Sequence, residues 1–282
     1  MIQTIGIIGA GQMGNGIAHV LAVAGYDILL TDTSNSQMQK ALRAIGNNLS
    51  RQVSRGHLEQ VDATDALARI QTVAGLPELA HAELVVEAAT EDEDIKRGIL
   101  SDLGKVLNPD ALICTNTSSI SITRLASVSG RPEKFMGMHF MNPVPIMKLV
   151  EVIRGHETSD ETTASVMQCS RALGKTPVEA NDYPGFVANR VLMPMINEAI
   201  FCLMEGVADR EGIDTVMQLG MAHPMGPLTL ADLIGLDVCL FILEVLHEGL
   251  GDDKYRPCPL LRRMVAAGHL GRKSGRGFYE YE

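Results

Sequence analysis

Ile5-Gly6-Ile7-Ile8-Gly9-Ala10-Gly11-Gln12-Met13-Gly14 is the segment from which the fold of this chain can first be predicted. Its first four residues carry no charge, as expected of a strand that is buried on both faces. The next six form a G-x-G-x-x-G motif, and residues 15–22 continue as a predicted helix that Gly25 ends. A second apolar run, residues 28–30, leads to Asp32. This order of strand, glycine turn, helix, strand and acid predicts a βαβ unit that binds a dinucleotide.

The glycines of the turn have separate tasks in such a unit. Gly9 permits the tight turn, Gly11 lets a pyrophosphate approach the backbone, and Gly14 lets the helix lie close to the strand. The helix N-terminus offers free N–H groups and the positive end of its dipole to the phosphates. The predicted cofactor contacts in this turn are Gly9, Ala10, Gly11, Gln12, Met13 and Gly14. The alternative interpretation is a βαβ turn without a ligand.

The acid that follows the second strand indicates which dinucleotide binds. The Asp32 carboxylate can accept hydrogen bonds from the adenosine ribose hydroxyls, and its charge would repel a 2′-phosphate. No Arg follows in Thr33-Ser34-Asn35, where one could hold that phosphate. The sequence therefore predicts NAD rather than NADP as the cofactor.

The composition excludes several classes of protein. The 282 residues suggest about two domains, and a hydrophobic content of 46% allows a large core. The net charge of −10 disfavours nucleic acid as a partner. The chain has no basic N-terminal segment followed by an apolar one and no long uninterrupted apolar stretch, so we expect no signal peptide and no membrane span.

The five cysteines are scattered, with no C-x-x-C spacing. This pattern is typical of free thiols in a reducing compartment, so we expect a cytoplasmic protein, and we expect no metal site. Cys114 lies at the end of an apolar run, which favours a buried packing role over a nucleophile.

The rest of the first two thirds alternates between predicted strands and helices. A long helix over 34–55, with Ser34 as a plausible N-cap, and a shorter one over 62–67 form a helical excursion near residues 34–70. Further strands are predicted over 84–86, 112–115, 135–140, 149–153 and 176–179, and further helices over 91–106 and 161–173. The alternation predicts an α/β fold with a Rossmann-like, doubly wound, mostly parallel sheet.

The pattern changes at Asp182-Tyr183-Pro184-Gly185, after which only helices are predicted. We therefore expect a NAD-binding Rossmann-like domain over residues 1–184 and an all-α domain over 185–282 for substrate binding and dimerisation. An all-α domain of this size has little core of its own, and its Met- and Leu-rich helices need a covering surface. We expect a homodimer through this domain.

Ligands of open α/β sheets lie at the carboxyl ends of the strands. Besides Asp32, this rule nominates residues 87–91, 116–119 and 139–142. His139 carries the most weight because the next predicted strand brings Glu151 back within reach. Hydride transfer needs a base for the alcohol proton, and a carboxylate partner fixes the imidazole tautomer and stabilises its protonated form. The spacing alone leaves open that Glu151 is a solvent-facing acid on an edge strand.

The chain resembles the short-chain 3-hydroxyacyl-CoA dehydrogenases from its first strand to its last few residues. The resemblance is carried by residues 7–14, 86–91, 115–119, 139–145 with Glu151, 182–190, 225–227, 232–237 and 271–279. It implies an NAD-dependent (S)-3-hydroxyacyl-CoA dehydrogenase that interconverts 3-hydroxybutyryl-CoA and acetoacetyl-CoA, with short-chain acyl-CoA as substrate.

The resemblance also implies residue roles. His139 would be the general acid/base and Glu151 its partner, while Ser118 and Asn189 would contact the substrate or His139. Asn189 also follows the domain boundary directly, where a site built at a domain junction would use it. By the same resemblance, the nicotinamide-ribose side is lined by Glu91, Lys96, Ser118 and Asn142.

Relatives hold the CoA moiety with basic residues of the helical excursion. The candidates in this chain are Arg51 and Arg55, one turn apart, where relatives often have lysine. The alternative interpretation is a solvated helix face.

Two other functions compete with the main interpretation. One is a dehydrogenase that acts on a free hydroxyacid, and the other is a non-catalytic protein that binds NAD as a structural component. The presence of His139, Glu151, Ser118 and Asn189 together speaks against the second.

Overall fold

The glycine motif follows the central strand of a sheet. The computed structural model describes residues 2–281, and within them eight strands form one sheet in the order β3-β2-β1-β4-β5-β6-β7-β8. The strands are β1 (Thr4–Ile8), β2 (Asp27–Thr31), β3 (Ile70–Thr72), β4 (Leu84–Glu87), β5 (Leu112–Thr115), β6 (Phe135–Phe140), β7 (Leu149–Arg154) and β8 (Thr176–Asn181). Neighbouring strands are parallel except β6 and β7. The predicted mostly parallel, doubly wound sheet is confirmed.

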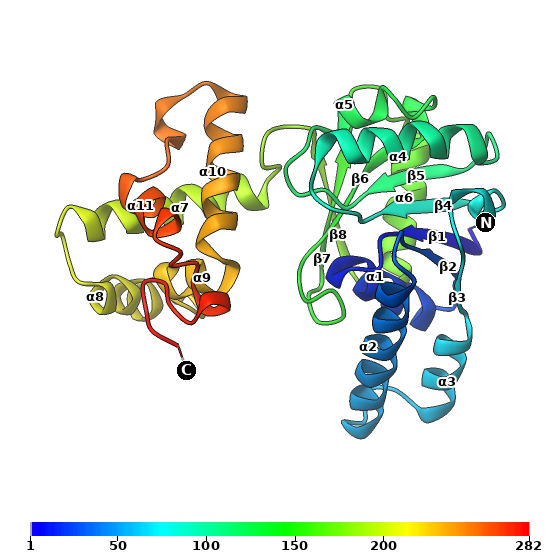
Figure 1. Cartoon of the computed structure of the whole chain (residues 1–282), viewed down its shortest axis with the longest axis horizontal. Helices are drawn as coiled ribbons and strands as arrows, with labels where there is room; N and C mark the ends of the chain where they lie inside the picture. Colours follow the sequence, from blue (N-terminus) through cyan, green and yellow to red (C-terminus); the bar gives the residue numbers. More distant parts are fainter. Residues whose placement is uncertain (1, 282) are drawn as a thin grey trace. The chain divides into compact units, whose positions relative to one another are not determined.

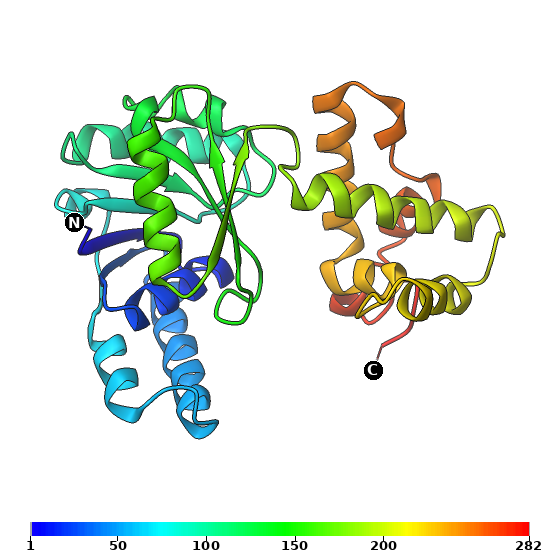
Figure 2. The ribbon, with the colours of Figure 1, turned by 180° about the vertical axis from the view of Figure 1, so that it is seen from behind.

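Helices cover both faces of this sheet (Figures 1 and 2). They are α1 (Gln12–Val23), α2 (Asn35–Ser54), α3 (Gln60–Ala68), α4 (Glu93–Val106), α5 (Ile122–Ala126) and α6 (Asp160–Ala172). Helices α1 and α6 bury side chains in one apolar cluster with β1, β2 and β4, and α4 packs beside α5. Helices α2 and α3 pack against each other as the predicted excursion.

Local sequence explains why α2 begins and lies where it does. The hydroxyl of Ser34 accepts a hydrogen bond from Gln37 N at 3.2 Å, which satisfies one of the free N–H groups of the first turn. The buried side chains of α2 recur at three- or four-residue steps and are Met38, Ala41, Ile45 and Leu49. This apolar stripe fixes which face of α2 turns toward the core.

Two elements of the first part of the chain were not predicted. Strand β3 has three residues and helix α5 has five, so each is too short to show a hydrophobic period. Strand β8 is two residues longer than predicted because it is an edge strand with mostly exposed side chains, and the end of such a strand carries no apolar run.

The chain divides into two compact units, with the first ending at Asp182 and the second beginning at Tyr183. The second unit contains α7 (Ala188–Met204), α8 (Arg210–Thr215), α9 (Pro227–Ile234), α10 (Leu236–Leu250) and α11 (Pro259–Ala266). Among its described residues the only β structure is a pair of isolated bridges centred on Arg276, so the predicted helical character is confirmed. Its buried apolar residues form a separate cluster.

The C-terminal segment is tied to the second unit by one buried acid. The carboxylate of Asp232, on α9, accepts hydrogen bonds from Phe278 N and Tyr279 N at 2.9 Å each and from the Tyr281 hydroxyl at 3.0 Å. Gly235 ends α9 with a φ of +106°, a backbone conformation that glycine adopts without strain. None of the helices between residues 2 and 281 combines the length and the apolar character needed to span a bilayer.

Candidate active site

The sheet order reverses between β1 and β4, which are neighbours although α1, β2 and β3 separate them in the chain. Ligands of open α/β sheets bind beside such a switch point, at the carboxyl ends of the strands. The loops that leave these ends are the glycine turn after Ile8 and the segment from Ala88 to Asp92. The candidate site is therefore built from the first residues of these two loops and of the loop after β5.

Three glycines give the turn the backbone geometry that a pyrophosphate site needs. Gly9 has a φ of +98°. A Cβ added to Gly14 would lie 1.8 Å from Gly9 O, so only glycine lets α1 begin this close to β1. A Cβ added to Gly11 would meet no protein atom within 4 Å, which leaves open space over the backbone. Gly11 is also the N-cap of α1, and no side chain satisfies the first N–H groups.

The acid at the end of β2 is held by the backbone around it. One carboxylate oxygen of Asp32 accepts a hydrogen bond from Ala10 N at 2.8 Å, and the other accepts one from Ser34 N at 2.9 Å. Gln37 Nε2 donates to Ala10 O at 3.0 Å and so ties the glycine turn to α2. Asp32 therefore lies beside the turn that would hold the pyrophosphate, as a contact to the adenosine ribose requires.

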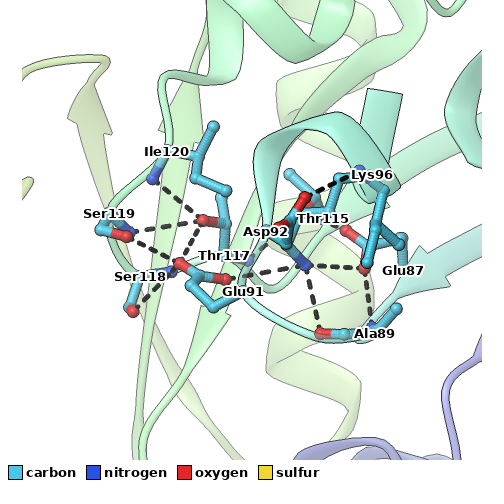
Figure 3. Close-up of polar contacts among 11 residues, drawn as sticks. Glu87, Ala89, Glu91, Asp92, Lys96, Thr115, Thr117, Ser118, Ser119 and Ile120 are labelled. Carbon is cyan, nitrogen blue, oxygen red and sulfur yellow. Dashed lines mark hydrogen bonds and ion pairs between the residues drawn. The ribbon is translucent and has the colours of Figure 1, made fainter. Parts of the chain in front are cut away.

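Figure 3 shows a polar cluster between the loops after β4 and β5. The Oε1 atom of Glu91 accepts hydrogen bonds from the hydroxyls of Thr117 at 2.6 Å and Ser119 at 2.8 Å and from Ser118 N at 2.9 Å. Its other oxygen lies 3.7 Å from Lys96 Nζ. The cluster thus brings together three residues expected at the nicotinamide ribose: Glu91, Lys96 and Ser118.

The charge of Glu91 is favoured by these neighbours. Burial is the largest single influence on its pKa and acts to raise it. The positive charge of Lys96 and the hydrogen bonds from residues 117–119 outweigh burial, so the pKa of Glu91 lies below its usual range. This carboxylate is therefore ionised at neutral pH.

Lys96 itself is 1% exposed. Its Nζ donates to Glu87 Oε1 at 2.7 Å and to Ala89 O at 3.3 Å. Glu87 is wholly buried at the end of β4, and its second oxygen accepts a hydrogen bond from the Thr115 hydroxyl at 2.6 Å. A buried ammonium and a buried carboxylate thus compensate each other behind Glu91 (Figure 3).

Asn142 follows β6 and is connected to the glycine turn. Gln12 Nε2 donates to Asn142 Oδ1 at 3.1 Å. The same end of β6 is fixed to the loop after β5, because Asn116 Oδ1 accepts a hydrogen bond from Phe140 N at 2.9 Å. Three loops of the first unit therefore converge at this edge of the sheet.

His139 and Glu151 lie directly opposite each other in the antiparallel ladder of β6 and β7. His139 Nδ1 is 2.9 Å from Glu151 Oε2, and the two side chains are 9% and 3% exposed. Because a carboxylate can only accept, Nδ1 carries the hydrogen, and Nε2 is the basic nitrogen of the ring. The solvent-facing alternative for Glu151 is wrong.

Three further expected site residues lie on other elements of the chain. Arg51 and Arg55 are exposed at the C-terminal end of α2, one turn apart. Asn189 lies in the first turn of α7, in the second unit. Cys114 is fully buried in β5, and burial raises the pKa of its thiol, so it stays protonated and packs as an apolar side chain.

Glu87, Thr117 and Ser119 were nominated from the sequence only as strand-end residues, and Thr115 was given no role. Two features of the sequence could have indicated these residues. One is a charged residue at the end of an otherwise apolar strand, and the other is a group of four hydroxyl residues around Asn116. Neither pattern reveals that Lys96, nine residues along the chain, is the buried partner of Glu87. No group of three or more potential metal ligands is found within residues 2–281.

The chain matches family models over nearly its whole length. Residues 4–183 match the NAD binding domain of 3-hydroxyacyl-CoA dehydrogenase, and residues 185–281 match the C-terminal domain of 3-hydroxyacyl-CoA dehydrogenase.

Individual proteins are similar over their full length. The chain is 54% identical over 281 residues to the 3-hydroxybutyryl-CoA dehydrogenase of Bradyrhizobium diazoefficiens, covering 100% of this chain and 96% of that protein. It is 44% identical over 277 residues to the 3-hydroxybutyryl-CoA dehydrogenase of Clostridioides difficile, covering 98% and 99%. The crystal structure of (S)-3-hydroxybutyryl-CoA dehydrogenase from Ralstonia eutropha has a TM-score of 0.98 at 50% identity, covering 100% of both chains.

Proposed function

The chain belongs to the 3-hydroxyacyl-CoA dehydrogenase family and is an NAD-dependent oxidoreductase, and on this premise we propose that it interconverts (S)-3-hydroxybutyryl-CoA and acetoacetyl-CoA. The observation that carries the proposal is the His139–Glu151 pair at the carboxyl end of β6, a buried imidazole with a carboxylate at 2.9 Å. The names of the similar proteins support the short acyl chain.

The proposed chemistry assigns each side chain a physical task. Nε2 of His139 accepts the proton of the C3 hydroxyl during oxidation and returns a proton to the C3 oxygen during reduction. Glu151 holds the ring tautomer and stabilises the imidazolium that forms. Bound NAD supplies the hydride acceptor. Ser118 and Asn189 are proposed to contact the substrate or His139, and Glu91, Lys96, Ser118 and Asn142 to line the nicotinamide ribose.

The proposed reaction is tested by following NADH absorbance with acetoacetyl-CoA and, in parallel, with free acetoacetate. We expect oxidation of NADH with the thioester only. Equal turnover of the free acid would instead indicate a dehydrogenase for free hydroxyacids. NADH binding without turnover of either substrate would indicate a non-catalytic NAD-binding protein.

NADH should support faster turnover than NADPH, because the negative charge of Asp32, next to the glycine turn, would repel a 2′-phosphate. Replacing Asp32 by Ala is expected to narrow the difference in kcat/KM between the two cofactors. Asp27, at the opposite end of β2, provides the control, since its replacement by Ala removes the same charge from the same strand. Equal efficiency with NADPH in the unmodified protein would contradict the assignment of Asp32.

Replacing Arg51 and Arg55 together by Ala should raise the KM for acetoacetyl-CoA by about tenfold or more and leave the KM for NADH unchanged. The expectation rests on charge-assisted hydrogen bonds to CoA phosphates, which contribute roughly 1.5–3 kcal/mol when buried and less when exposed. Added salt should weaken acyl-CoA binding more in the unmodified protein than in the variant.

The control for this pair is the replacement of Lys40 and Arg43 by Ala, which removes two positive charges from the same helix. The control should keep the acyl-CoA KM if the effect is a local contact. If the variant at residues 51 and 55 also keeps it, this face of α2 is solvated and CoA binds elsewhere.

We propose a cytoplasmic homodimer that associates through the second unit. Its described surface carries large apolar side chains that are more than half exposed: Val187, Val191, Val207, Val216, Leu219 and Met221. Such side chains favour association because burying them removes apolar area from water. The cytoplasmic location is supported by the five free cysteines.

Light scattering at micromolar concentration should give twice the mass of one chain. Leu219→Asp should shift the protein toward the monomer, because it places a charge among these apolar side chains. Val61→Asp, at an exposed apolar residue of the first unit, serves as the control and should stay dimeric. A monomeric mass for the unmodified protein would contradict the proposal.

A further inference from the structure

Glu87 is a buried carboxylate that the proposed chemistry does not use. Its side chain is 0% exposed. Oε1 accepts hydrogen bonds from Lys96 Nζ and from Ala89 N, both at 2.7 Å, and Oε2 accepts one from the Thr115 hydroxyl at 2.6 Å. Every one of these donors belongs to β5, α4 or the loop after β4, so Glu87 connects the elements that frame the cofactor edge.

The positive charge of Lys96 is compensated by this carboxylate. Taking an ammonium out of water costs several kcal/mol unless a partner compensates it. Within residues 2–281, the carboxylates at ion-pair distance from Lys96 Nζ are Glu87 at 2.7 Å and Glu91 at 3.7 Å. Glu87 is the closer of the two and is hydrogen bonded to the ammonium, so it is the main counter-ion.

Lys96 in turn faces the carboxylate that orders the next loop. Glu91 lies between Lys96 on one side and the hydroxyl and N–H donors of residues 117–119 on the other (Figure 3). Its side chain is 31% exposed, so it is the member of the chain Glu87–Lys96–Glu91 that reaches the surface.

We propose that Glu87 is a positioning residue for the cofactor: it fixes Lys96 and, through Lys96, holds Glu91 and the Ser118 loop in the arrangement that receives the nicotinamide ribose. Glu87 acts without touching the ribose itself, because it is fully buried. The inference rests on the proposed placement of NAD against Glu91, Lys96 and Ser118.

The substitution Glu87→Gln removes the negative charge of the side chain and keeps its shape. The glutamine oxygen can still accept from Lys96 and Ala89, and its amide can donate to the Thr115 hydroxyl, which can also accept. Packing and hydrogen bonds are therefore kept, and only the negative charge opposite Lys96 is lost. Without it, the buried ammonium loses its main counter-ion, so Lys96 and with it Glu91 are held less firmly.

The test is the Kd of NADH, measured by fluorescence titration. The ratio of the Kd of Glu87→Gln to that of the unmodified protein should reach roughly tenfold, the fold-change of one charge-assisted hydrogen bond. Glu83→Gln is the matched control. Glu83 directly precedes β4 and accepts hydrogen bonds from Gln3 N and Thr4 N, so Glu83→Gln should leave the Kd of NADH unchanged.

A double-mutant cycle with Lys96→Gln separates this positioning role from a merely structural one. If Glu87 acts through Lys96, adding Glu87→Gln to Lys96→Gln should leave the NADH Kd unchanged. If Glu87→Gln alone fails to fold, the double variant with both substitutions still tests the proposal, because no uncompensated buried charge remains in it. Thermal melts establish that each variant is folded.

Two results would overturn the inference. One is a Glu87→Gln variant whose NADH Kd equals that of the unmodified protein. The other is a loss of affinity that is undiminished in the Lys96→Gln background. Failure of the unmodified protein to bind NADH would be a different result and would overturn the proposed function instead.

Discussion

Replacing His139 by Gln should lower kcat by about 10²–10⁴-fold, the usual contribution of general acid/base catalysis, while NADH still binds. The glutamine amide can still donate to Glu151 and so fill the place of the ring, but it cannot exchange a proton with the C3 oxygen. The measurement is single-turnover oxidation of NADH by acetoacetyl-CoA, with the NADH Kd as a parallel readout. Near-normal turnover would show that another group moves the proton.

Glu151→Gln is the companion variant, and its effect has a predictable sign. The negative charge beside the ring stabilises the imidazolium, which gives its proton to the substrate during reduction of acetoacetyl-CoA, so removal of that charge should move the alkaline limb of the pH–rate profile for this reaction to lower pH. Turnover should also fall, because the ring loses the partner that fixes its tautomer. A pH–rate profile identical to that of the unmodified protein would remove Glu151 from the pair.

Gly11→Val should abolish most NADH binding without unfolding the protein. A Cβ at Gly11 meets no protein atom within 4 Å, so the fold can accept the side chain. The same space is where the pyrophosphate would approach the backbone. Crowding of a packed site typically costs about 1–3 kcal/mol, which corresponds to a rise in Kd of roughly fivefold to 150-fold. Titration calorimetry and a thermal melt give the two readouts.

Gly98→Val is the control for this substitution. Gly98 lies on α4, and a Cβ added there also meets no protein atom within 4 Å, so the same side chain is introduced away from the glycine turn. It should leave NADH affinity unchanged. If Gly11→Val binds NADH as tightly as the unmodified protein, the pyrophosphate does not approach this backbone.

The sequence predicted best the elements that are specified by residues close together in the chain. The glycine turn, α1, β2 and Asp32 follow one another within 32 residues. Local requirements explain the residue types in this part of the chain and at the start of α2: Gly14 must lack a Cβ, Ser34 is an N-cap, and β1 is an apolar run. The same holds for α2, whose apolar stripe appears directly in the periodicity. Short elements such as β3 and α5 were not predicted, because three to five residues are too few to show a hydrophobic period.

The buried chain of Glu87, Lys96 and Glu91 could not be derived in this way. Lysine on an amphipathic helix is ordinarily a solvent-facing residue, and nothing in the sequence of α4 marks Lys96 as an exception. Its burial arises because α4 packs against the sheet with this side chain directed toward the end of β4, where Glu87 accepts its hydrogen bond. The environment of a charged side chain is set by elements that come together only in the folded chain.

A dinucleotide-binding βαβ unit, a mostly parallel sheet and a helical second part could be predicted from the sequence, because patterning and glycine positions are properties of short segments. That His139 stands opposite Glu151 is known only from the folded chain, since the antiparallel register of β6 and β7 sets that pair. The same is true of the contact of Glu91 with the loop after β5 and of the neutralisation of Lys96 by Glu87. Register and the burial of charge depend on contacts between distant segments, and the free energy of those contacts exists only once the sheet is assembled.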